Sequence, residues 1–317
     1  MYNPILKERF IADYSDKESM RTMARSFFEL FERYETKWAA DLCTRSAEEI
    51  QPIVNKMIGM RRGSQYSRMN VLSAYLKWCV EHHIPDAKNF IGDIVVSRDD
   101  NMRRGTVANP AHLQWYLNQL LRPESEDTID NVLRCYYWLA YGGATEDEAL
   151  GVKISDVNFT TMTVRCSGYK EIPIYREALP AFRSCTQLTQ FRVVLPHYKK
   201  DSFRDRAPGD LLLRGIKPEI NHSAFRVPMS NKTKAAVEAG KTDLRLSYFR
   251  VFISGVFYRT YELERAGMPI DFKKIASSQL QVIDRSKLTK PQNAKTRRTL
   301  KAREFQYDYE CWKRVYT

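Results

Sequence analysis

Arg250 stands in the setting that most clearly calls for a chemical partner. It lies in the apolar stretch LSYFRVFISGVF, directly between Phe249 and Val251. An unpaired guanidinium group is costly to bury among such side chains, so we expect Arg250 to face either a phosphate group or an acidic residue. Glu148 is the acidic alternative, and with that partner Arg250 would be a structural residue.

Two further groups of residues have the composition of a phosphate-binding surface. The first cation group surrounds a short turn bracketed by Gly59 and Gly63, and it comprises Arg61, Arg62, Arg68 and Lys77 together with the polar Ser64. The second cation group is a run of eight Lys and Arg residues over 285–303 without an acid, including Lys295, Arg297 and Arg298. Composition alone also allows a solvated helix face for the first group and a solvated loop for the second.

The net charge favours a polyanionic partner. The 317 residues carry a formal charge of +13 and a pI near 9.4, and clustered cations gain affinity for phosphate backbones by releasing counterions. Residues 1–97 are nearly balanced, with 14 Lys and Arg against 13 Asp and Glu, whereas the remainder has 37 against 25. The positive excess therefore lies in the second part of the chain.

Metal, redox and membrane chemistry are not indicated. The six cysteines lie far apart, with no pair at the spacing of a zinc site or a redox dithiol, and the five histidines form no metal-ligand spacing. We therefore expect no metal and no cofactor, and cysteines that act as small buried apolar residues. The first residues do not resemble a signal peptide, and no stretch approaches the ~20 apolar residues of a membrane span, which favours a cytoplasmic protein.

The elements that would position these residues predict a mainly α-helical protein with a small β-sheet. In the first hundred residues, apolar side chains recur at three- and four-residue steps over 20–38. A second helix begins after Ser46, with Glu49 completing a capping box, and a third begins with Ser64 as its N-cap.

The length of the chain predicts two domains. The stretch 98–110 is polar and punctuated by Gly and Pro, which is typical of an interdomain linker. The domains would then be 1–97 and 111–317, with the second cation group as a basic insertion in the latter.

The second domain is expected to combine helices with a hairpin. Residues 128–143 predict a helix that ends at Gly142 and Gly143. Alternation over 161–175 predicts a β-hairpin with its turn near Gly168 and with Lys170, by default an exposed lysine, beside that turn. Later helices are expected over 242–267, 270–280 and 302–316, the last with an aromatic face of Phe305, Tyr309 and Trp312.

The order of these elements resembles that of the tyrosine recombinases, the family of the phage integrases. The sequence from Ile50 to Cys79, which includes VLSAYLKWC, looks like part of the SAM-like core-binding domain. This resemblance covers roughly one third of the chain. The stretch YGGATEDEALGVKISDVNF is similar to the form TGLRxSExLxLxxxDID of the catalytic domain. The resemblance implies a two-domain protein of phage or mobile-element origin that binds double-stranded DNA.

The resemblance also implies roles for individual residues. SGYKEIPI matches the segment that carries the catalytic lysine, at Lys170, and LSYFRVFISGVF places Arg250 at the second catalytic arginine. The nucleophile would be Tyr307, with Tyr309 and Tyr316 as alternatives, although by default Tyr307 packs in an aromatic helix face. The resemblance favours phosphate contacts for the first cation group, and it allows a homo-oligomer on DNA through the C-terminal helix.

Several positions depart from the family pattern. Thr145 occupies the place of the first catalytic arginine, and Ser247 and Val251 occupy both histidine positions. Threonine cannot copy the forked donor geometry of arginine, and the loss of one such donor commonly costs about 10²- to 10³-fold in rate. Arg134 and Lys153 are the nearby cations that could fill the gap.

Three functions remain open from the sequence. The first is a DNA-binding relative with a degenerate cleavage site, which we favour slightly over the second, an active recombinase that forms a 3′-phosphotyrosine. The third is a basic helical module that binds RNA or another protein.

Overall fold

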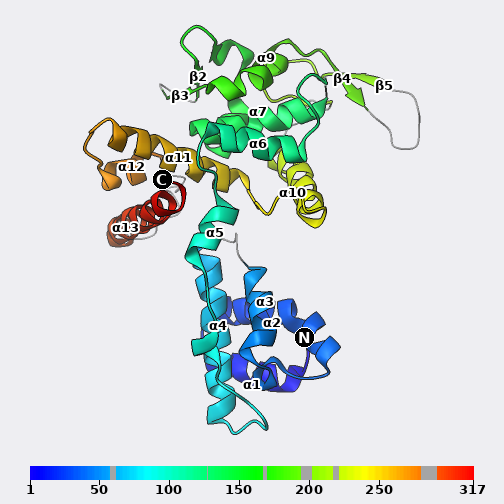
Figure 1. Cartoon of the computed structure of the whole chain (residues 1–317), viewed down its shortest axis with the longest axis vertical. Coiled ribbons are helices and arrows are strands. Elements are labelled where there is room, and N and C mark those ends of the chain that lie inside the picture. Colours follow the sequence, from blue (N-terminus) through cyan, green and yellow to red (C-terminus); the bar gives the residue numbers. More distant parts are fainter. Residues whose placement is uncertain (58–61, 127, 167–169, 194–201, 217–220, 280–290) are drawn as a thin grey trace. The chain divides into compact units, whose positions relative to one another are not determined.

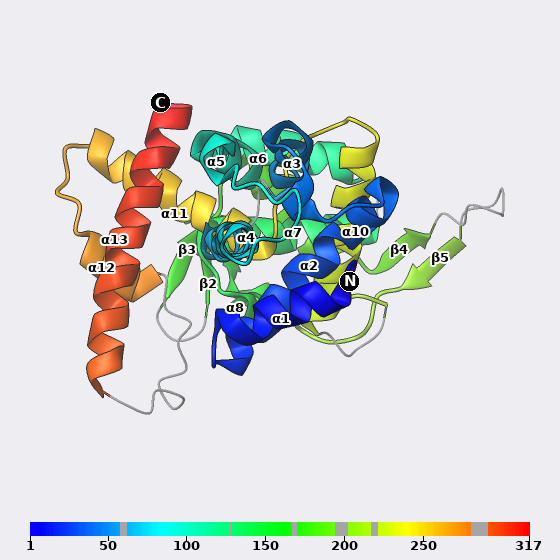
Figure 2. The ribbon, with the colours of Figure 1, turned by 90° about the horizontal axis from the view of Figure 1, so that it is seen from below.

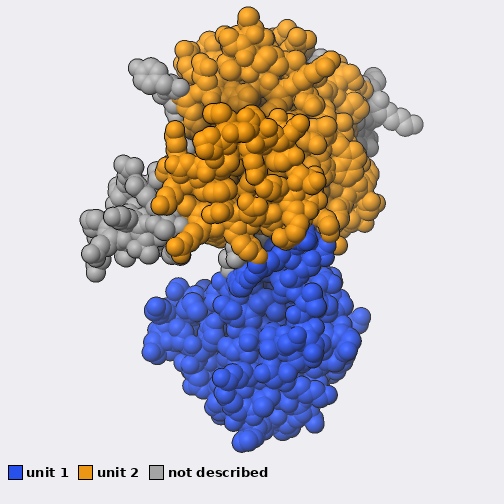
Figure 3. All heavy atoms as spheres, turned by 60° about the vertical axis from the view of Figure 1, so that its left-hand side comes forward, with its two compact units in different colours: residues 1–101 blue, residues 102–317 orange. Residues whose placement is uncertain are grey.

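The computed structural model divides the chain into two compact units, unit 1 (residues 1–101) and unit 2 (residues 102–317) (Figures 1 and 3). The structure describes residues 1–57, 62–126, 128–166, 170–193, 202–216, 221–279 and 291–317, and within helices it leaves out the side chains of 62–64, 278–279 and 291–301. Each unit has its own apolar core. The described residues are mainly helical with two small antiparallel sheets, which confirms the predicted fold class.

Unit 1 is a helical domain around an aromatic core. Its elements are α1 (Pro4–Tyr14), α2 (Glu18–Trp38), η1 (Leu42–Thr44), α3 (Ala47–Asn55), α4 (Arg62–Glu81) and η2 (Ile91–Asp93). Phe10, Phe28 and Tyr75 meet edge to face at its centre, where such ring pairs add to the gain from burial. The capping box of Ser46 and Glu49 forms as predicted at the start of α3.

Two features of unit 1 differ from the sequence expectation. The helix α4 begins at Arg62, so Ser64 lies inside its first turn and is not the N-cap. The helix α1 was not expected, because its inward face includes a charge, Lys7, which breaks the apolar periodicity.

The expected linker is partly helical. Residues Arg98–Gly105 form α5, and the boundary between the units falls inside it. The hydroxyl of Ser97 accepts a hydrogen bond from the N–H of Asp100 at 3.1 Å. Acidic residues then occupy the first turn and arginines the last, which suits the helix dipole. Local capping therefore outweighs the polar composition that suggested irregular backbone.

Unit 2 surrounds the buried helix α7 (Figures 1 and 2). Its helices are α6 (Pro110–Leu120), α7 (Ile129–Gly142), α8 (Glu146–Gly151), η3 (Ile154–Asp156), η4 (Arg176–Ala178), α9 (Leu179–Gln187), α10 (His222–Glu238), α11 (Tyr248–Arg265), α12 (Phe272–Gln279) and α13 (Pro291–Tyr316). Its strands are β1 (Val157–Asn158), β2 (Thr163–Arg165), β3 (Glu171–Pro173), β4 (Gln190–Val193) and β5 (Ser202–Asp205).

The two sheets of unit 2 are small. The first has the order β1-β2-β3, and the predicted hairpin is its β2–β3 pair, with Val164 opposite Ile172. The turn near Gly168 lies outside the described residues. The second sheet pairs β4 with β5 and was not expected from the sequence.

Close contact between α7 and α11 organises unit 2. Gly255 of α11 lies so near the end of α7 that an added Cβ would overlap the carbonyl group of Tyr141. Glycine at position 255 therefore sets the distance between the two helices.

At the end of α7, Gly143 has a φ of 112°, the left-handed conformation predicted for its C-cap.

We predict that Gly255→Ala lowers the free energy of unfolding by about 3 kcal/mol or more, because the methyl group must push two packed helices apart. Urea denaturation measures this change. Gly151→Ala is the matched control, since a Cβ there meets no atom within 4 Å, and its stability should stay near that of the parent protein. Equal stability of the two variants would contradict the close approach of the helices.

A buried ion pair ties α1 to α2. Lys7 and Glu35 are both fully buried, and Lys7 Nζ lies 2.5 Å from Glu35 Oε2. Glu35 also accepts the backbone N–H of Leu42 at 2.9 Å. Removing only one partner of such a pair leaves an uncompensated buried charge.

We predict that Lys7→Met destabilises the protein by about 3–5 kcal/mol, because Glu35 loses its counter-charge. The double variant Lys7→Met/Glu35→Leu should regain most of the stability. Thermal and urea unfolding of the parent and both variants measures these changes. If the double variant proves no more stable than the single one, the unpaired Glu35 carboxylate is not the main cause of the loss.

Candidate nucleic-acid interface

Thr145 performs a structural task at the position where the resemblance expects an arginine. Its hydroxyl accepts the backbone N–H of Glu148 at 3.3 Å, and the Glu148 carboxylate accepts the N–H of Thr145 at 2.7 Å. The two residues thus form the capping box of α8. A short hydroxyl side chain suits this role, because an N-cap must accept a hydrogen bond and arginine has no acceptor.

Lys170 also has a partner in α8. Its Nζ lies 2.6 Å from Glu148 Oε2, in a pair whose side chains are 33% and 17% exposed. Burial by itself raises the pKa of the Glu148 carboxyl group, but the hydrogen bonds from Lys170 and Thr145 outweigh it and leave that pKa below its ordinary value. Glu148 is therefore a carboxylate at neutral pH, and it accepts a hydrogen bond from Lys170, the residue that the resemblance matches to the family's catalytic lysine.

The remaining acids of the first turn of α8 are paired as well. Arg226 of α10 donates through both Nε and Nη2 to the two carboxylate oxygens of Glu146, which also accepts the hydroxyl of Tyr136. His222 Nε2 lies 3.0 Å from Asp147 Oδ1. Sequence reasoning did not select Arg226, because it lies 80 residues from Glu146 and no local motif connects them.

Arg250 lies in the first turn of α11, and its side chain is partly exposed. Its guanidinium group rests against Gly105, where an added Cβ would lie 3.3 Å from Arg250 Cζ. Ser247 is the N-cap of α11 and accepts the N–H of Arg250 at 3.4 Å, and Val251 is fully buried. Both positions where the family has histidines therefore hold residues that build the helix and the core.

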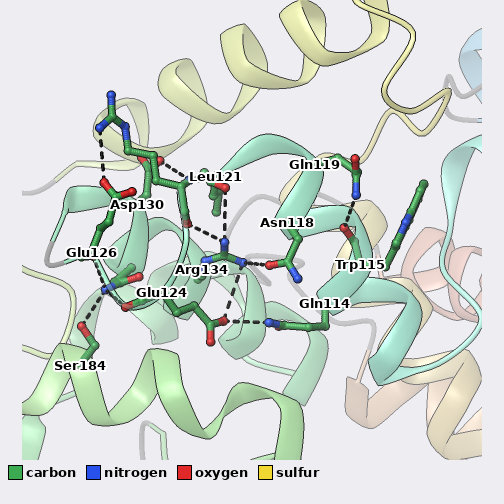
Figure 4. Close-up of polar contacts among 12 residues, drawn as sticks. Gln114, Trp115, Asn118, Gln119, Leu121, Glu124, Glu126, Asp130, Arg134 and Ser184 are labelled. Carbon is green, nitrogen blue, oxygen red and sulfur yellow. Dashed lines mark hydrogen bonds and ion pairs between the residues drawn. The ribbon is translucent and has the colours of Figure 1, made fainter. Parts of the chain in front are cut away.

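Neither of the two cations proposed to fill the gap at Thr145 does so. Arg134 is fully buried and donates to Asn118 Oδ1 at 2.8 Å and to the carbonyl oxygen of Arg122 at 2.7 Å, so it holds the segment after α6 (Figure 4). Lys153 pairs with Asp210 at 2.7 Å. Both side chains are therefore committed to other contacts.

The three candidate tyrosines differ in their surroundings. Tyr307 is 40% exposed on α13, and it has contacts of its own. Tyr309 is buried and donates its hydroxyl to Glu264 at 2.5 Å. Burial and the Glu264 carboxylate raise the pKa of Tyr309 above its ordinary value, which opposes formation of a phenolate nucleophile. The hydroxyl of Tyr316 donates to the carbonyl oxygen of Thr106 at 2.8 Å.

The aromatic face of α13 is used within its own chain. Phe305, Tyr309 and Trp312 are at most 3% exposed and stack around Phe257 of α11. Trp312 Nε1 also donates to the carbonyl oxygen of Val107 at 3.0 Å. These three rings are therefore packed against α11 and α12 of the same unit, and docking of the C-terminal helix on a neighbouring protomer stays a prediction.

The first cation group maps to α4 of unit 1. Arg61 lies outside the described residues, and Arg62 and Ser64 belong to α4 with side chains outside the described part. Arg68 and Lys77 are nine positions apart, which at about 100° per residue places them on opposite sides of the helix. Lys77 is 70% exposed and lies 3.6 Å from Glu81. A duplex laid against one side of α4, and not around it, would therefore meet Arg68 or Lys77 but not both.

The second cation group is described only in part. Residues 285–290 lie outside the described residues, whereas Lys295, Arg297 and Arg298 belong to α13 with side chains outside the described part. In the part of the chain that is described, no group of His, Cys, Asp and Glu is placed to hold a metal ion. All six cysteines are unpaired and buried, as expected. A search of the same residues finds no helix with the length and apolar character needed to cross a membrane.

Comparisons with known proteins give one family match and several similar folds. Among solved structures, the chain is similar to XerA recombinase, with 13% identity, 86% of this chain and 87% of that chain covered, and a TM-score of 0.35. It is similar to a lambda integrase dimer bound to a COC′ core site, with 14% identity, 92% of this chain and 98% of that chain covered, and a TM-score of 0.35. It is also similar to the Tn1549 transposon integrase in complex with circular intermediate DNA, with 11% identity, 92% of this chain and 97% of that chain covered, and a TM-score of 0.34. No curated protein sequence matches the chain.

The family match concerns the first part of the chain. Residues 1–81 match the family model described as MrpR, N-terminal core-binding domain. These residues contain α1 to α4. They include the stretch from Ile50 to Cys79, whose sequence resembles a core-binding domain. Residues 1–81 are therefore similar to the core-binding domain that this family model describes.

Proposed function

We propose that the protein binds double-stranded DNA with its core-binding domain and a recombinase-like second unit, and that it does not cleave the strands. The family match of residues 1–81 supports the first part of this proposal. The formal charge of +13 supports it as well, because a polyanionic partner gains from such an excess.

The observation that carries the proposal is the capping box at Thr145. A transferred phosphate would need forked, charge-assisted donors around its oxygens, and this position instead presents a hydroxyl that accepts a backbone N–H. The three acids that follow, Glu146, Asp147 and Glu148, place negative charge in the same turn. A phosphate arriving there would meet carboxylates that already hold Arg226 and Lys170.

DNA binding and DNA cleavage therefore separate in this chain. The cations that would hold a duplex are Arg61, Arg62, Arg68, Lys295, Arg297 and Arg298, with Arg250 as a phosphate contact in unit 2. Cleavage would need a free nucleophile, and of the three tyrosines only Tyr307 is exposed. The active recombinase is thus the alternative that a direct assay must exclude.

We predict that the protein forms no covalent adduct with DNA, because the cleavage site lacks its first arginine and both histidines. The test uses a duplex selected from a random library by its binding to the protein. The duplex is then nicked at successive positions to trap any phosphotyrosine, and adducts are detected on denaturing gels.

An adduct that disappears in Tyr307→Phe, Tyr309→Phe or Tyr316→Phe would overturn the assignment and favour the active recombinase, with that tyrosine as its nucleophile. An affinity for single-stranded RNA equal to that for duplex DNA across a salt titration would favour the basic RNA-binding module.

We predict that Arg68→Ala weakens duplex binding and lowers the slope of log affinity against log salt by about one, because one phosphate contact is lost. Fluorescence anisotropy at several salt concentrations measures this slope. Lys77→Ala is the matched control, since Lys77 belongs to the opposite side of α4, and its slope should equal that of the parent protein. A larger effect of Lys77→Ala would place the duplex on the other side of the helix.

A further inference from the structure

The β4–β5 pair forms a two-stranded ribbon that projects from unit 2 in both ribbon views (Figures 1 and 2). The first cation group, the second cation group and the residues matched to the recombinase site all lie outside this ribbon. Its register places Arg192 opposite Phe203 and Phe191 opposite Arg204.

The base of the ribbon is held firmly. Arg206, only 6% exposed, donates to the carbonyl oxygens of Cys185, Leu188 and Leu212, with 3.1 Å to Leu188. The backbone N–H of Arg206 also donates to the carbonyl oxygen of Thr189 at 2.8 Å. Phe191, in β4, is buried. A buried guanidinium group that satisfies three carbonyl groups fixes the direction in which the strands leave the unit.

The outer part of the ribbon exposes an aromatic ring between cations. Phe203 is 63% exposed, and Arg204 next to it is exposed as well. The side chain of Arg192 is 37% exposed and lies 3.8 Å from Glu126. Because opposite residues share a face of the ribbon, Arg192 and Phe203 lie on one face and Arg204 on the other.

We propose that the β4–β5 ribbon enters a groove of duplex DNA, where Arg192 and Arg204 contact phosphates and Phe203 packs against sugars and base edges. The proposal rests on the proposed function, and it adds a DNA contact in unit 2 that is independent of the core-binding domain. The major groove admits a two-stranded ribbon. A cation on each face suits a groove, because phosphate backbones line both of its walls.

The charge of the ribbon favours DNA over a protein partner. The described residues of the two strands carry two cations, Arg192 and Arg204, against one exposed acid, Asp205, which accepts a hydrogen bond from Gln190 at 2.9 Å, so their net charge is positive. Phe203 is accompanied by polar Ser202 and charged Arg204, so the described residues of the ribbon present a single ring and no apolar patch. A protein-binding surface would instead carry a contiguous apolar centre.

The test compares variants of the full chain on the library-selected duplex. Arg192→Ala/Arg204→Ala should lower the salt slope by about two, and Phe203→Ala should weaken binding about fivefold or more. The control Lys234→Ala/Arg265→Ala removes the same charge from exposed positions of α10 and α11, and it should leave the affinity within about twofold. Far-UV circular dichroism and thermal unfolding confirm that each variant is folded.

Hydroxyl-radical footprinting locates the contact. The parent protein should protect a discrete segment that becomes accessible in Phe203→Ala/Arg204→Ala, while protection by the rest of the protein remains. If the parent protein binds DNA and the ribbon variants share its slope, affinity and footprint, the ribbon proposal is overturned and the proposed function stands. If the parent protein does not bind duplex DNA at any salt concentration, both proposals fail.

Discussion

The approach of α11 to α7 at Gly255 is the constraint on which the geometry of unit 2 depends. With no side chain between them, the two backbones come into contact at Tyr141, and this sets how closely α11 approaches the end of α7. One turn further on, Arg259 donates to the carbonyl oxygen of Tyr141 and lies over Gly143, where a Cβ would be 2.8 Å from its Nη2. Two successive turns of α11 thereby contact the end of α7.

The same contact determines the surroundings of the candidate site. At the start of α11, Tyr248 is buried and donates its hydroxyl to the carbonyl oxygens of Ala144 at 2.9 Å and Thr145 at 3.2 Å. The segment that leads into α8 is therefore pinned to the helix that carries Arg250.

Electrostatics then decides what the site can bind. Carboxylates and phosphates compete for the same donors, and a carboxylate fixed in the protein has no entropy of association to lose. Glu148 forms an ion pair with Lys170, and Glu146 forms one with Arg226, so these two cations already have a carboxylate partner inside unit 2. In unit 1, the pair of Lys7 and Glu35 is internal in the same way, but it is fully buried and joins helices. Charge on an exposed side chain, such as that of Arg204 on the β4–β5 ribbon, is what a polyanion can reach.

The sequence alone determined the local features. Helix periodicity, the capping box at Ser46, the glycine C-cap at Gly143 and the β2–β3 hairpin follow from interactions among residues a few positions apart, and so they could be predicted. The departures from the family pattern at Thr145, Ser247 and Val251 could likewise be identified from the sequence. Only the tertiary structure decided which side chains meet across long separations. It paired Lys170 with Glu148 and Arg226 with Glu146, brought Gly255 against Tyr141, and buried the aromatic face of α13 in its own unit. Such contacts depend on how packed helices are arranged in space, and no local periodicity or spacing specifies that arrangement.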